Sequence, residues 1–301
     1  MTGLGLRLGV LLLPTDPWPE SVARAQRLEA QGFDHLWVYD HLSWRRYHDR
    51  PWHATFPWLT GLAAATSRIR LGTMVANPNL RHPLVLAKDA MTIDHISEGR
   101  LTVGLGAGGT GYDAGVLGQE PLSPAQRLAR LEEYAPLLAG LLRGEVRDHA
   151  GEWFTVEDGR VLPGCVQQPS VPIALAAGGR RGLRLTAEVA DAWITYGSTA
   201  SHDHDGAQTE RTVRTQLATI EERCAELGRD PAELDRIYLV GNTRERPLAS
   251  IEAFTEFVER YAALGFTDLV FHDLRPDDPV WNDPPEVIDE IADRFLVSAQ
   301  D

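Results

Sequence analysis

An aspartate and a histidine that are neighbours in the sequence have the side chains best suited to acid–base chemistry. Asp40 and His41 directly follow the apolar segment 35–39, and Trp44 comes three residues later. Histidine carries protons near pH 7, and a nearby carboxylate would orient its ring. We therefore expect His41, oriented by Asp40, to polarise or deprotonate a substrate. Trp44 is expected to form one wall of the substrate pocket. The alternative is a structural histidine packed under the site.

Two glycine-rich turns have the composition of anion-binding loops. The segments 106–111 and 178–182 each follow an apolar segment, and Arg180 opens the helical segment after the second turn. Glycine lets backbone N–H groups approach an anion closely, and the N-terminus of a helix adds positive potential. The two turns therefore predict a site for a phosphate group. Alternatively, their glycines only form tight turns between strand and helix.

Short apolar segments alternate with segments of helical periodicity along the chain and predict eight strand–helix pairs. The expected strands are 8–13, 35–39, 69–75, 101–105, 172–176, 192–195, 237–240 and 268–271. The expected helices are 20–31, 58–66, 84–97, 125–142, 180–190, 210–227, 251–264 and 285–296. This α/β pattern predicts a single (β/α)8 TIM barrel over residues 1–301, with an open doubly wound sheet as the alternative. Residues 143–171 break the alternation and predict a hairpin insertion before the fifth strand.

A barrel of this kind would gather the candidate residues at one end. Asp40 and His41 follow the second expected strand, the glycine-rich turns follow the fourth and fifth, and Thr195 ends the sixth. Active sites of TIM barrels are built at the C-terminal ends of the strands. We therefore expect all of these residues at one barrel mouth.

The composition excludes several classes of protein. The 301 residues include 29 Lys and Arg against 43 Asp and Glu, which gives a formal net charge of −14. This acidic balance argues against binding to nucleic acid or to anionic membranes. The longest apolar run, 8–13, is too short to span a bilayer, and no cleavable signal follows it. We therefore expect a cytoplasmic protein.

No metal site is expected from the residue types. The only two cysteines, Cys165 and Cys224, exclude a disulfide scaffold and a cysteine-rich metal centre. His202, Asp203, His204 and Asp205 are potential ligands in a loop. Their alternation does not place the two rings on one rigid face, so we do not expect them to bind a metal.

An ordered set of segments resembles the bacterial-luciferase-like oxidoreductases, a family of α/β barrels that use FMN or the deazaflavin coenzyme F420. The similar segments are 32–41, 66–73, 81–88, 94–101, 104–108, 176–179 and 190–193. The deazaflavin branch is closer, because its sugar-phosphate dehydrogenases carry an Asp-His pair and a following Trp similar to Asp40, His41 and Trp44. The family often has a non-proline cis peptide after the third strand, which maps to Met74 and Val75.

The resemblance implies an enzyme that transfers a hydride between coenzyme F420 (8-hydroxy-5-deazaflavin) and a small organic substrate. The ring would lie against the segment 74–76, and the phosphate tail would reach both glycine-rich turns. The expected cofactor contacts are Asp40, Met74, Val75, Ala76, Gly106, Ala107, Gly108, Gly109, Ala177, Gly178, Gly179, Arg180 and Thr195. The resemblance also implies a homodimer.

Two positions depart from the sugar-phosphate dehydrogenases. Gly109 stands where they have a glutamate that donates a proton, and Ser198 stands where they have a lysine that binds the sugar phosphate. Sugar-phosphate oxidation is therefore not expected, and the substrate and the direction of transfer stay open. The alternatives are an FMN-dependent monooxygenase fed by a separate reductase and a non-catalytic cofactor-binding barrel. If His41 is structural, Tyr112, Asp113 or His272 would have to carry the proton.

Overall fold

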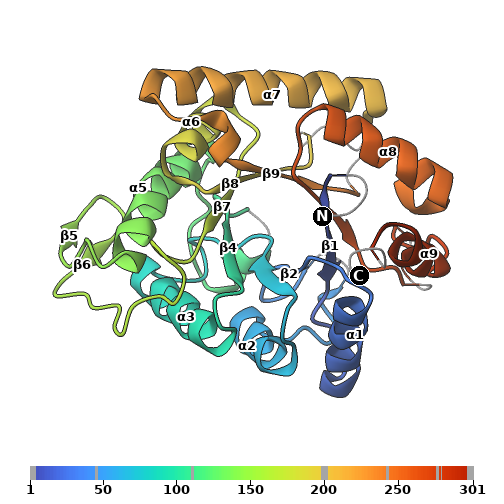
Figure 1. Ribbon diagram of the computed structural model, residues 1–301. Coiled ribbons are helices and arrows are strands. Elements are labelled where there is room, and N and C mark those ends of the chain that lie inside the picture. The colour runs from blue at the N-terminus through green and yellow to red at the C-terminus, as the bar shows by residue number, and fades with distance from the viewer. Residues whose placement is uncertain are drawn as a thin grey trace.

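Eight parallel strands close into a barrel in the computed structural model, which describes residues 5–44, 47–109, 112–197, 203–241, 244–275, 278 and 280–296 (Figure 1). The barrel strands are β1 (Arg7–Leu12), β2 (His35–Val38), β3 (Arg70–Thr73), β4 (Leu101–Leu105), β7 (Ile173–Ala176), β8 (Ala192–Thr195), β9 (Asp235–Leu239) and β10 (Asp268–His272). Their order around the barrel is β1-β10-β9-β8-β7-β4-β3-β2. β1 and β10 pair in parallel and close the ring, so the predicted TIM barrel is confirmed and the open sheet is wrong.

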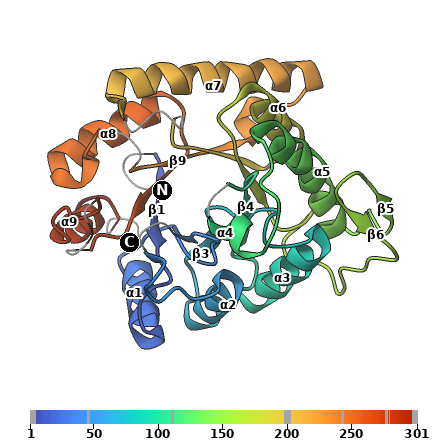
Figure 2. The ribbon, with the colours of Figure 1, turned by 180° about the vertical axis from the view of Figure 1, so that it is seen from behind.

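Helices form the outer layer of the barrel (Figure 1). They are α1 (Trp18–Ala30), α2 (Thr55–Ala65), α3 (Pro83–Ile96), α4 (Tyr112–Val116), α5 (Pro124–Leu142), α6 (Arg180–Val189), α7 (Gly206–Leu227), α8 (Ile251–Ala263) and α9 (Glu286–Phe295), with 3₁₀ turns at Pro231–Glu233 and Pro247–Ala249. α4 was not predicted; Figure 2 shows it beside the end of β4. No helix in the described ranges is long and apolar enough to cross a membrane.

The expected hairpin insertion lies outside the barrel, next to α3 and α5 (Figure 1). Its strands β5 (His149–Ala150) and β6 (Thr155–Val156) pair in antiparallel fashion. Glu133 of α5 accepts hydrogen bonds from His149 Nε2 at 3.0 Å and from the backbone N–H of Phe154 at 2.9 Å. Lys88 of α3 donates to the carbonyl of Leu162 at 3.0 Å. These contacts fix the insertion to two neighbouring helices.

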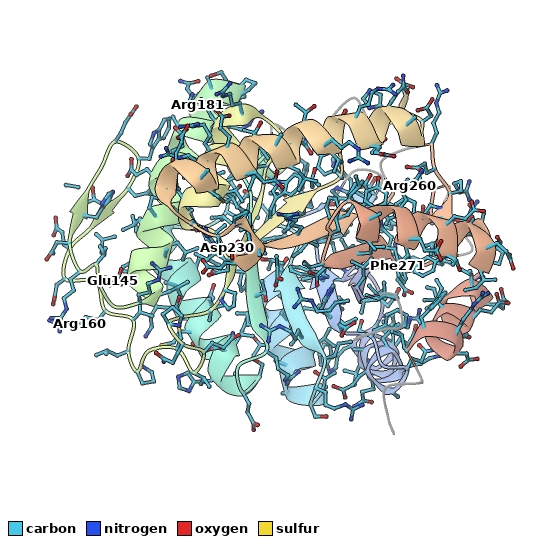
Figure 3. All side chains as sticks on the ribbon, turned by 45° about the horizontal axis from the view of Figure 1, so that its top comes forward. Glu145, Arg160, Arg181, Asp230, Arg260 and Phe271 are labelled. Atoms are coloured by element: carbon cyan, nitrogen blue, oxygen red, sulfur yellow. The ribbon has the colours of Figure 1, made fainter. Side chains whose placement is uncertain are left out.

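The outer core lies between the strands and the helices. Phe271 of β10 is fully buried and meets the rings of Phe33 and Phe254 edge-on, with ring centroids 5.9 Å apart in both pairs. Figure 3 shows Phe271 inside the molecule, whereas Glu145 and Arg160 lie at its edge. Aromatic pairs of this geometry add to the stabilisation that burial of their apolar surface provides.

The inside of the barrel holds a polar network at its N-terminal end. His35 donates from Nε2 to Asp268 at 2.9 Å, and Trp37 donates from Nε1 to His35 Nδ1 at 2.6 Å. Two strand glycines make room for these rings: a Cβ on Gly9 would lie 1.8 Å from His35, and one on Gly72 would lie 2.4 Å from Trp37. Because side chains alternate along a strand, Tyr39 follows His35 and Trp37 inward and reaches the opposite end.

Candidate active site

A cavity of about 700 Å³ opens at the C-terminal mouth of the barrel. It is bounded by the ends of β2, β3, β4, β7 and β8. Ten of the expected cofactor contacts line it, namely Met74, Val75, Gly106, Ala107, Gly108, Gly109, Ala177, Gly178, Gly179 and Thr195. His41, Tyr39, Asn77, Arg127, Ile194 and Tyr196 are among the other lining residues. The structure thus brings together most of the residues that the sequence selected.

One wall of the cavity is formed by the segment that follows β3. The Met74–Val75 peptide is cis, as expected. Ala76 donates its N–H to the carbonyl of Gly104 at 2.7 Å and accepts from the N–H of Gly106 at 2.9 Å. A Cβ on Gly106 would lie 2.5 Å from Val75, so glycine is needed for this close approach. Ala76 itself is buried behind the wall and does not line the cavity, which differs from the expectation.

Asn79 and Arg130 hold the first glycine-rich turn, and sequence reasoning assigned neither of them to the site. Asn79 donates from Nδ2 to the carbonyl of Gly109 at 3.1 Å and accepts from the buried guanidinium of Arg130. Gly108 has a φ of +77°, and a Cβ there would lie 2.8 Å from Asn79. The turn therefore requires glycine at 108 for its own conformation. Thr110 and Gly111, which continue the turn in the sequence, lie outside the described residues.

Gln216 of α7 joins the loops that follow β7 and β8. Its Nε2 donates to the carbonyls of Gly197 at 2.6 Å and Gly178 at 3.2 Å, and its Oε1 accepts from Thr195 Oγ1 at 2.9 Å. Only 3% of Gln216 is exposed. A polar residue within the apolar stripe of a helix is a signal that could have identified it from the sequence.

Arg180 does not reach the cavity. Arg180 is the first residue of α6. Its side chain is largely exposed and pairs with Glu222 at 3.6 Å. The expected contact between its side chain and a cofactor is therefore not supported.

His41 is paired with Asp113, not with Asp40. The His41 side chain lines the cavity and is 30% exposed, and its Nδ1 is hydrogen-bonded to Oδ2 of Asp113 in α4. Oδ1 of Asp113 accepts the backbone N–H of Leu42 at 2.7 Å. Burial alone would raise the pKa of Asp113, but the hydrogen bonds from His41 and Leu42 hold it below its usual range.

Asp40 points away from the cavity. It is 1% exposed and forms an ion pair with Arg81, whose guanidinium lies over the ring of Phe56 at 4.3 Å. Burial raises the pKa of Asp40 against the opposing effect of Arg81. Asp40 was expected to orient His41 and to contact the cofactor, and this expectation is corrected. Asp40 is buried outside the cavity lining, where it pairs with Arg81.

Trp44 belongs to an aromatic cluster beside the cavity rather than to its lining. Its ring stacks on Trp281, with centroids 5.6 Å apart, and on Tyr47 at 6.1 Å. Tyr39 lines the cavity, and its hydroxyl is hydrogen-bonded to His272 Nε2 at 2.6 Å. His272 is 1% exposed and is connected to the cavity lining by this hydrogen bond. The cavity lining thus does not include Trp44, which was expected to form a wall of the substrate pocket.

The cavity suits an anionic, flavin-sized group. Its volume lies within the range of cofactor sites. Its described lining contains His41 and Arg127 but no carboxylate, although the chain carries a net charge of −14. The backbone at Gly179 is open, because a Cβ would meet nothing within 4 Å, whereas a Cβ on Gly178 would lie 3.3 Å from Gln216 Nε2.

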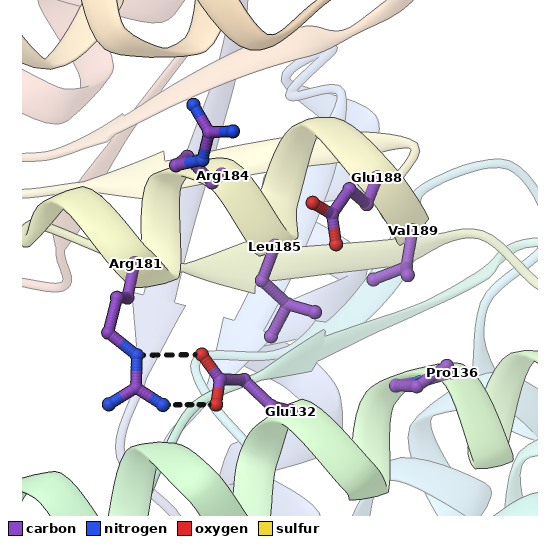
Figure 4. A pocket seen from close by; sticks show the side chains of 7 residues that line it. All are labelled: Glu132, Pro136, Arg181, Arg184, Leu185, Glu188 and Val189. Carbon is purple, nitrogen blue, oxygen red and sulfur yellow. Dashed lines mark hydrogen bonds and ion pairs between the residues drawn. The ribbon is translucent and has the colours of Figure 1, made fainter. Parts of the chain in front are cut away.

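A second hollow, of about 340 Å³, lies between α5 and α6 on the outside of the barrel (Figure 4). Leu185, Pro136 and Val189 line it, together with charged side chains. Arg181 pairs with Glu132, and Glu188 pairs with Arg223 at 2.7 Å. Because these charges neutralise one another, the hollow offers little to an ionic ligand.

Metal ligands do not cluster in the described part of the chain, where no group of three or more His, Cys, Asp or Glu side chains is arranged to hold an ion. Of the loop residues considered from the sequence, Asp203, His204 and Asp205 are described, whereas His202 lies outside the described residues.

The closed barrel and the cavity at its C-terminal mouth define a TIM-barrel protein with an enzyme-like site. The chain belongs to the bacterial luciferase-like family: residues 6–284 match the family model described as luciferase-like monooxygenase. It is 32% identical to an F420-dependent glucose-6-phosphate dehydrogenase of Beutenbergia cavernae, over 83% of this chain and 85% of the relative. It is 28% identical to a 5,10-methylenetetrahydromethanopterin reductase of Methanolobus tindarius, over 90% and 76% of the two chains.

A solved structure supports the fold independently. An F420-dependent secondary alcohol dehydrogenase, solved with an F420-acetone adduct, superposes with a TM-score of 0.78 at 18% identity, over 98% of this chain and 99% of that chain. The family resemblance inferred from the sequence is thus confirmed.

Proposed function

We propose that this protein is a coenzyme F420-dependent oxidoreductase that transfers a hydride between the deazaflavin and a small organic substrate. The observation that carries the proposal is the cavity at the barrel mouth, which joins a glycine-lined wall without described carboxylates to His41. The deazaflavin, when bound, supplies the hydride acceptor or donor. Gly178 and Gly179 would let the backbone approach it closely, and His41 moves the substrate proton. Relatives named as F420-dependent enzymes support the choice of cofactor.

We do not propose that this protein shares the substrate of the glucose-6-phosphate dehydrogenases. Gly109 offers no side chain where those enzymes donate a proton, and it contributes only its backbone to the cavity wall. Ser198, at the position of their phosphate-binding lysine, lies outside the described residues. We therefore propose a different small organic substrate, with His41 as the proton carrier.

Coenzyme F420 is expected to bind more tightly than FMN. The reason is that the relatives named above are F420-dependent enzymes, whereas the family model alone describes a monooxygenase. Isothermal titration of the purified protein with each cofactor measures the difference. Micromolar binding of FMN without binding of F420 would favour the monooxygenase instead. A direct assay of hydride transfer then separates an enzyme from a non-catalytic cofactor-binding barrel.

Alanine at Gly178 is expected to raise the dissociation constant of F420 by about tenfold, which corresponds to roughly 1.4 kcal/mol. The Cβ would lie 3.3 Å from Gln216 Nε2 and would occupy the wall that the anionic tail approaches. Gly115→Ala is the matched control, since a Cβ there would meet nothing within 4 Å and Gly115 does not line the cavity. Gly108→Ala is less suitable, because its positive φ would also destabilise the fold. Unchanged binding by Gly178→Ala would show that Gly178 serves only the turn.

We further propose a cytoplasmic homodimer. The unpaired thiols of Cys165 and Cys224 support a reducing compartment.

The proposed dimer surface is formed by exposed apolar side chains on two segments that contact each other. These side chains are Val85 and Ile96 of α3 and Leu162 and Val166 of the insertion. A second copy of the chain would cover such a surface. Sedimentation is expected to give twice the 33.3 kDa of the chain, and a monomer would contradict the dimer.

A further inference from the structure

The carboxylate of Asp113 contacts His41 at one of its two ring nitrogens, Nδ1, and His41 itself lines the cavity. We infer that Asp113 is a positioning residue that keeps the proton of neutral His41 on Nδ1 and leaves Nε2 as the proton acceptor. The consequence for turnover rests on the proposed function, whereas the position of the proton does not. The residue comes from α4, an element that no sequence motif indicated.

Both oxygens of Asp113 serve as acceptors. Oδ2 faces Nδ1 of His41, and Oδ1 accepts the backbone N–H of Leu42 at 2.7 Å. The hydrogen bonds from His41 and Leu42 hold the pKa of Asp113 below its usual range despite burial, so the group is ionised at neutral pH. An ionised carboxylate has no proton to donate. Nδ1 of His41 must therefore be the donor, and the lone pair of the neutral ring lies on Nε2.

No other described charged group competes for this ring nitrogen. Asp40, the preceding residue, is paired with Arg81. The rings of Tyr39, Trp44 and Trp52 surround His41 at centroid distances of 6.0 to 6.4 Å. Trp52 also donates from Nε1 to the backbone carbonyl of His41 at 2.8 Å, which fixes the main chain. The orientation of the imidazole is thus set by packing, and its tautomer by Asp113.

This tautomer suits a substrate that interconverts a hydroxyl and a carbonyl group. The hydroxyl proton passes to Nε2, so an O–H bond breaks and an N–H bond forms. The electron pair of the adjacent C–H bond leaves with the hydride to the deazaflavin of the proposed function, and a C=O bond remains. The imidazolium that results is stabilised by the negative charge of Asp113. In the reverse direction, the same imidazolium returns its proton to the oxygen.

The variant Asp113→Asn tests the inference because asparagine has a single oxygen. Leu42 N–H needs that oxygen as its acceptor, which turns the amide NH₂ group towards His41. Nδ1 must then accept, and the proton of the neutral ring moves to Nε2. In the catalytic triad of serine proteases, the equivalent substitution lowers kcat by about 10⁴-fold through the wrong tautomer. We expect kcat to fall by about 10²–10⁴-fold here, with KM and cofactor binding nearly unchanged.

The tautomer is read from ¹⁵N chemical shifts of protein labelled at its 10 histidines, with the His41 signals identified in a His41→Asn variant. This measurement needs neither cofactor nor substrate, so it is independent of the proposed function. The wild type should show a protonated Nδ1, and Asp113→Asn a protonated Nε2. Asp113→Ala, which offers Nδ1 neither donor nor acceptor, should show a mixture. Asp49→Asn, at an exposed aspartate eight residues after His41 in the sequence, should change neither the shifts nor kcat.

Two results would overturn the inference. If His41 has the same tautomer in the wild type and in both Asp113 variants, Asp113 does not position it. If the tautomer changes and kcat does not, Nε2 of His41 is not the proton acceptor in the reaction.

Discussion

Replacement of His41 by alanine is expected to lower kcat by about 10²–10⁴-fold, the usual contribution of general acid–base catalysis. His41 is a lining residue of the mouth cavity with a carboxylate partner behind it, which is the arrangement that such catalysis requires. The dissociation constant of F420 should change much less, because the glycine-rich turns hold the cofactor tail in the proposed complex. Steady-state kinetics and cofactor titration of the same protein preparation measure the two effects.

His41→Asn separates proton transfer from hydrogen bonding. Asparagine keeps polar contacts but moves no proton, so this variant should stay as slow as His41→Ala. Near-normal turnover by His41→Asn would mean that His41 only orients the substrate. Near-normal turnover by His41→Ala would make His41 structural. In that case Tyr39 is the route to a second proton carrier, since its hydroxyl connects the cavity to His272. Tyr112 is exposed, and its ring contacts that of His48 at an interplanar angle of 50°.

Asp268→Asn is expected to destabilise the protein by about 3 kcal/mol, in the range for breaking a buried ion pair. Asp268 accepts from His35 at 2.9 Å and from Arg7 at 2.8 and 2.7 Å, and its side chain is 4% exposed. An asparagine would turn its NH₂ group towards one of these donors. Arg7 also pairs with Asp235, which limits the loss. Urea denaturation at pH 7 measures the change in the free energy of unfolding.

Asp289→Asn is the matched control for this experiment. Asp289 also accepts two hydrogen bonds from an arginine, Arg27, but both side chains are exposed. The loss there should stay below about 1 kcal/mol, as for other surface ion pairs. Equal losses in the two variants would show that burial of Asp268 adds nothing.

The contribution of Asp268 should depend on pH in a defined direction. Burial would raise its pKa, but the hydrogen bonds from His35 and Arg7 and the charge of Arg7 lower it to about 2. A carboxyl group with a lowered pKa stabilises the fold above its ordinary pKa, and this stabilisation is lost as the pH falls towards the folded value. The difference in unfolding free energy between wild type and Asp268→Asn should therefore be constant above about pH 5 and shrink by about 2 kcal/mol between pH 4 and pH 2. A difference that does not change over this range would contradict the assignment.

Sequence periodicity determined the barrel, because buried parallel strands and their crossover helices have characteristic lengths and patterns. It also placed the glycine-rich turns at strand ends, where the structure finds the cavity wall. Boundaries were less accurate: α2 begins at Thr55, three residues before the expected start. α4, with five residues, is too short for any helical period to show in the sequence.

The partners of the site residues were decided only by the tertiary structure. Asp40 and His41 are neighbours in the chain, yet consecutive residues at the end of a strand point in opposite directions. Asp40 therefore pairs with Arg81, outside the cavity lining. His41 lines the cavity and pairs with Asp113, 72 residues further along the chain. Gln216 of α7 likewise contacts Thr195 and Gly178, which precede it in the chain by 21 and 38 residues. The sequence determines which residue types stand at the ends of the strands, whereas packing of the helices and loops decides which of them meet.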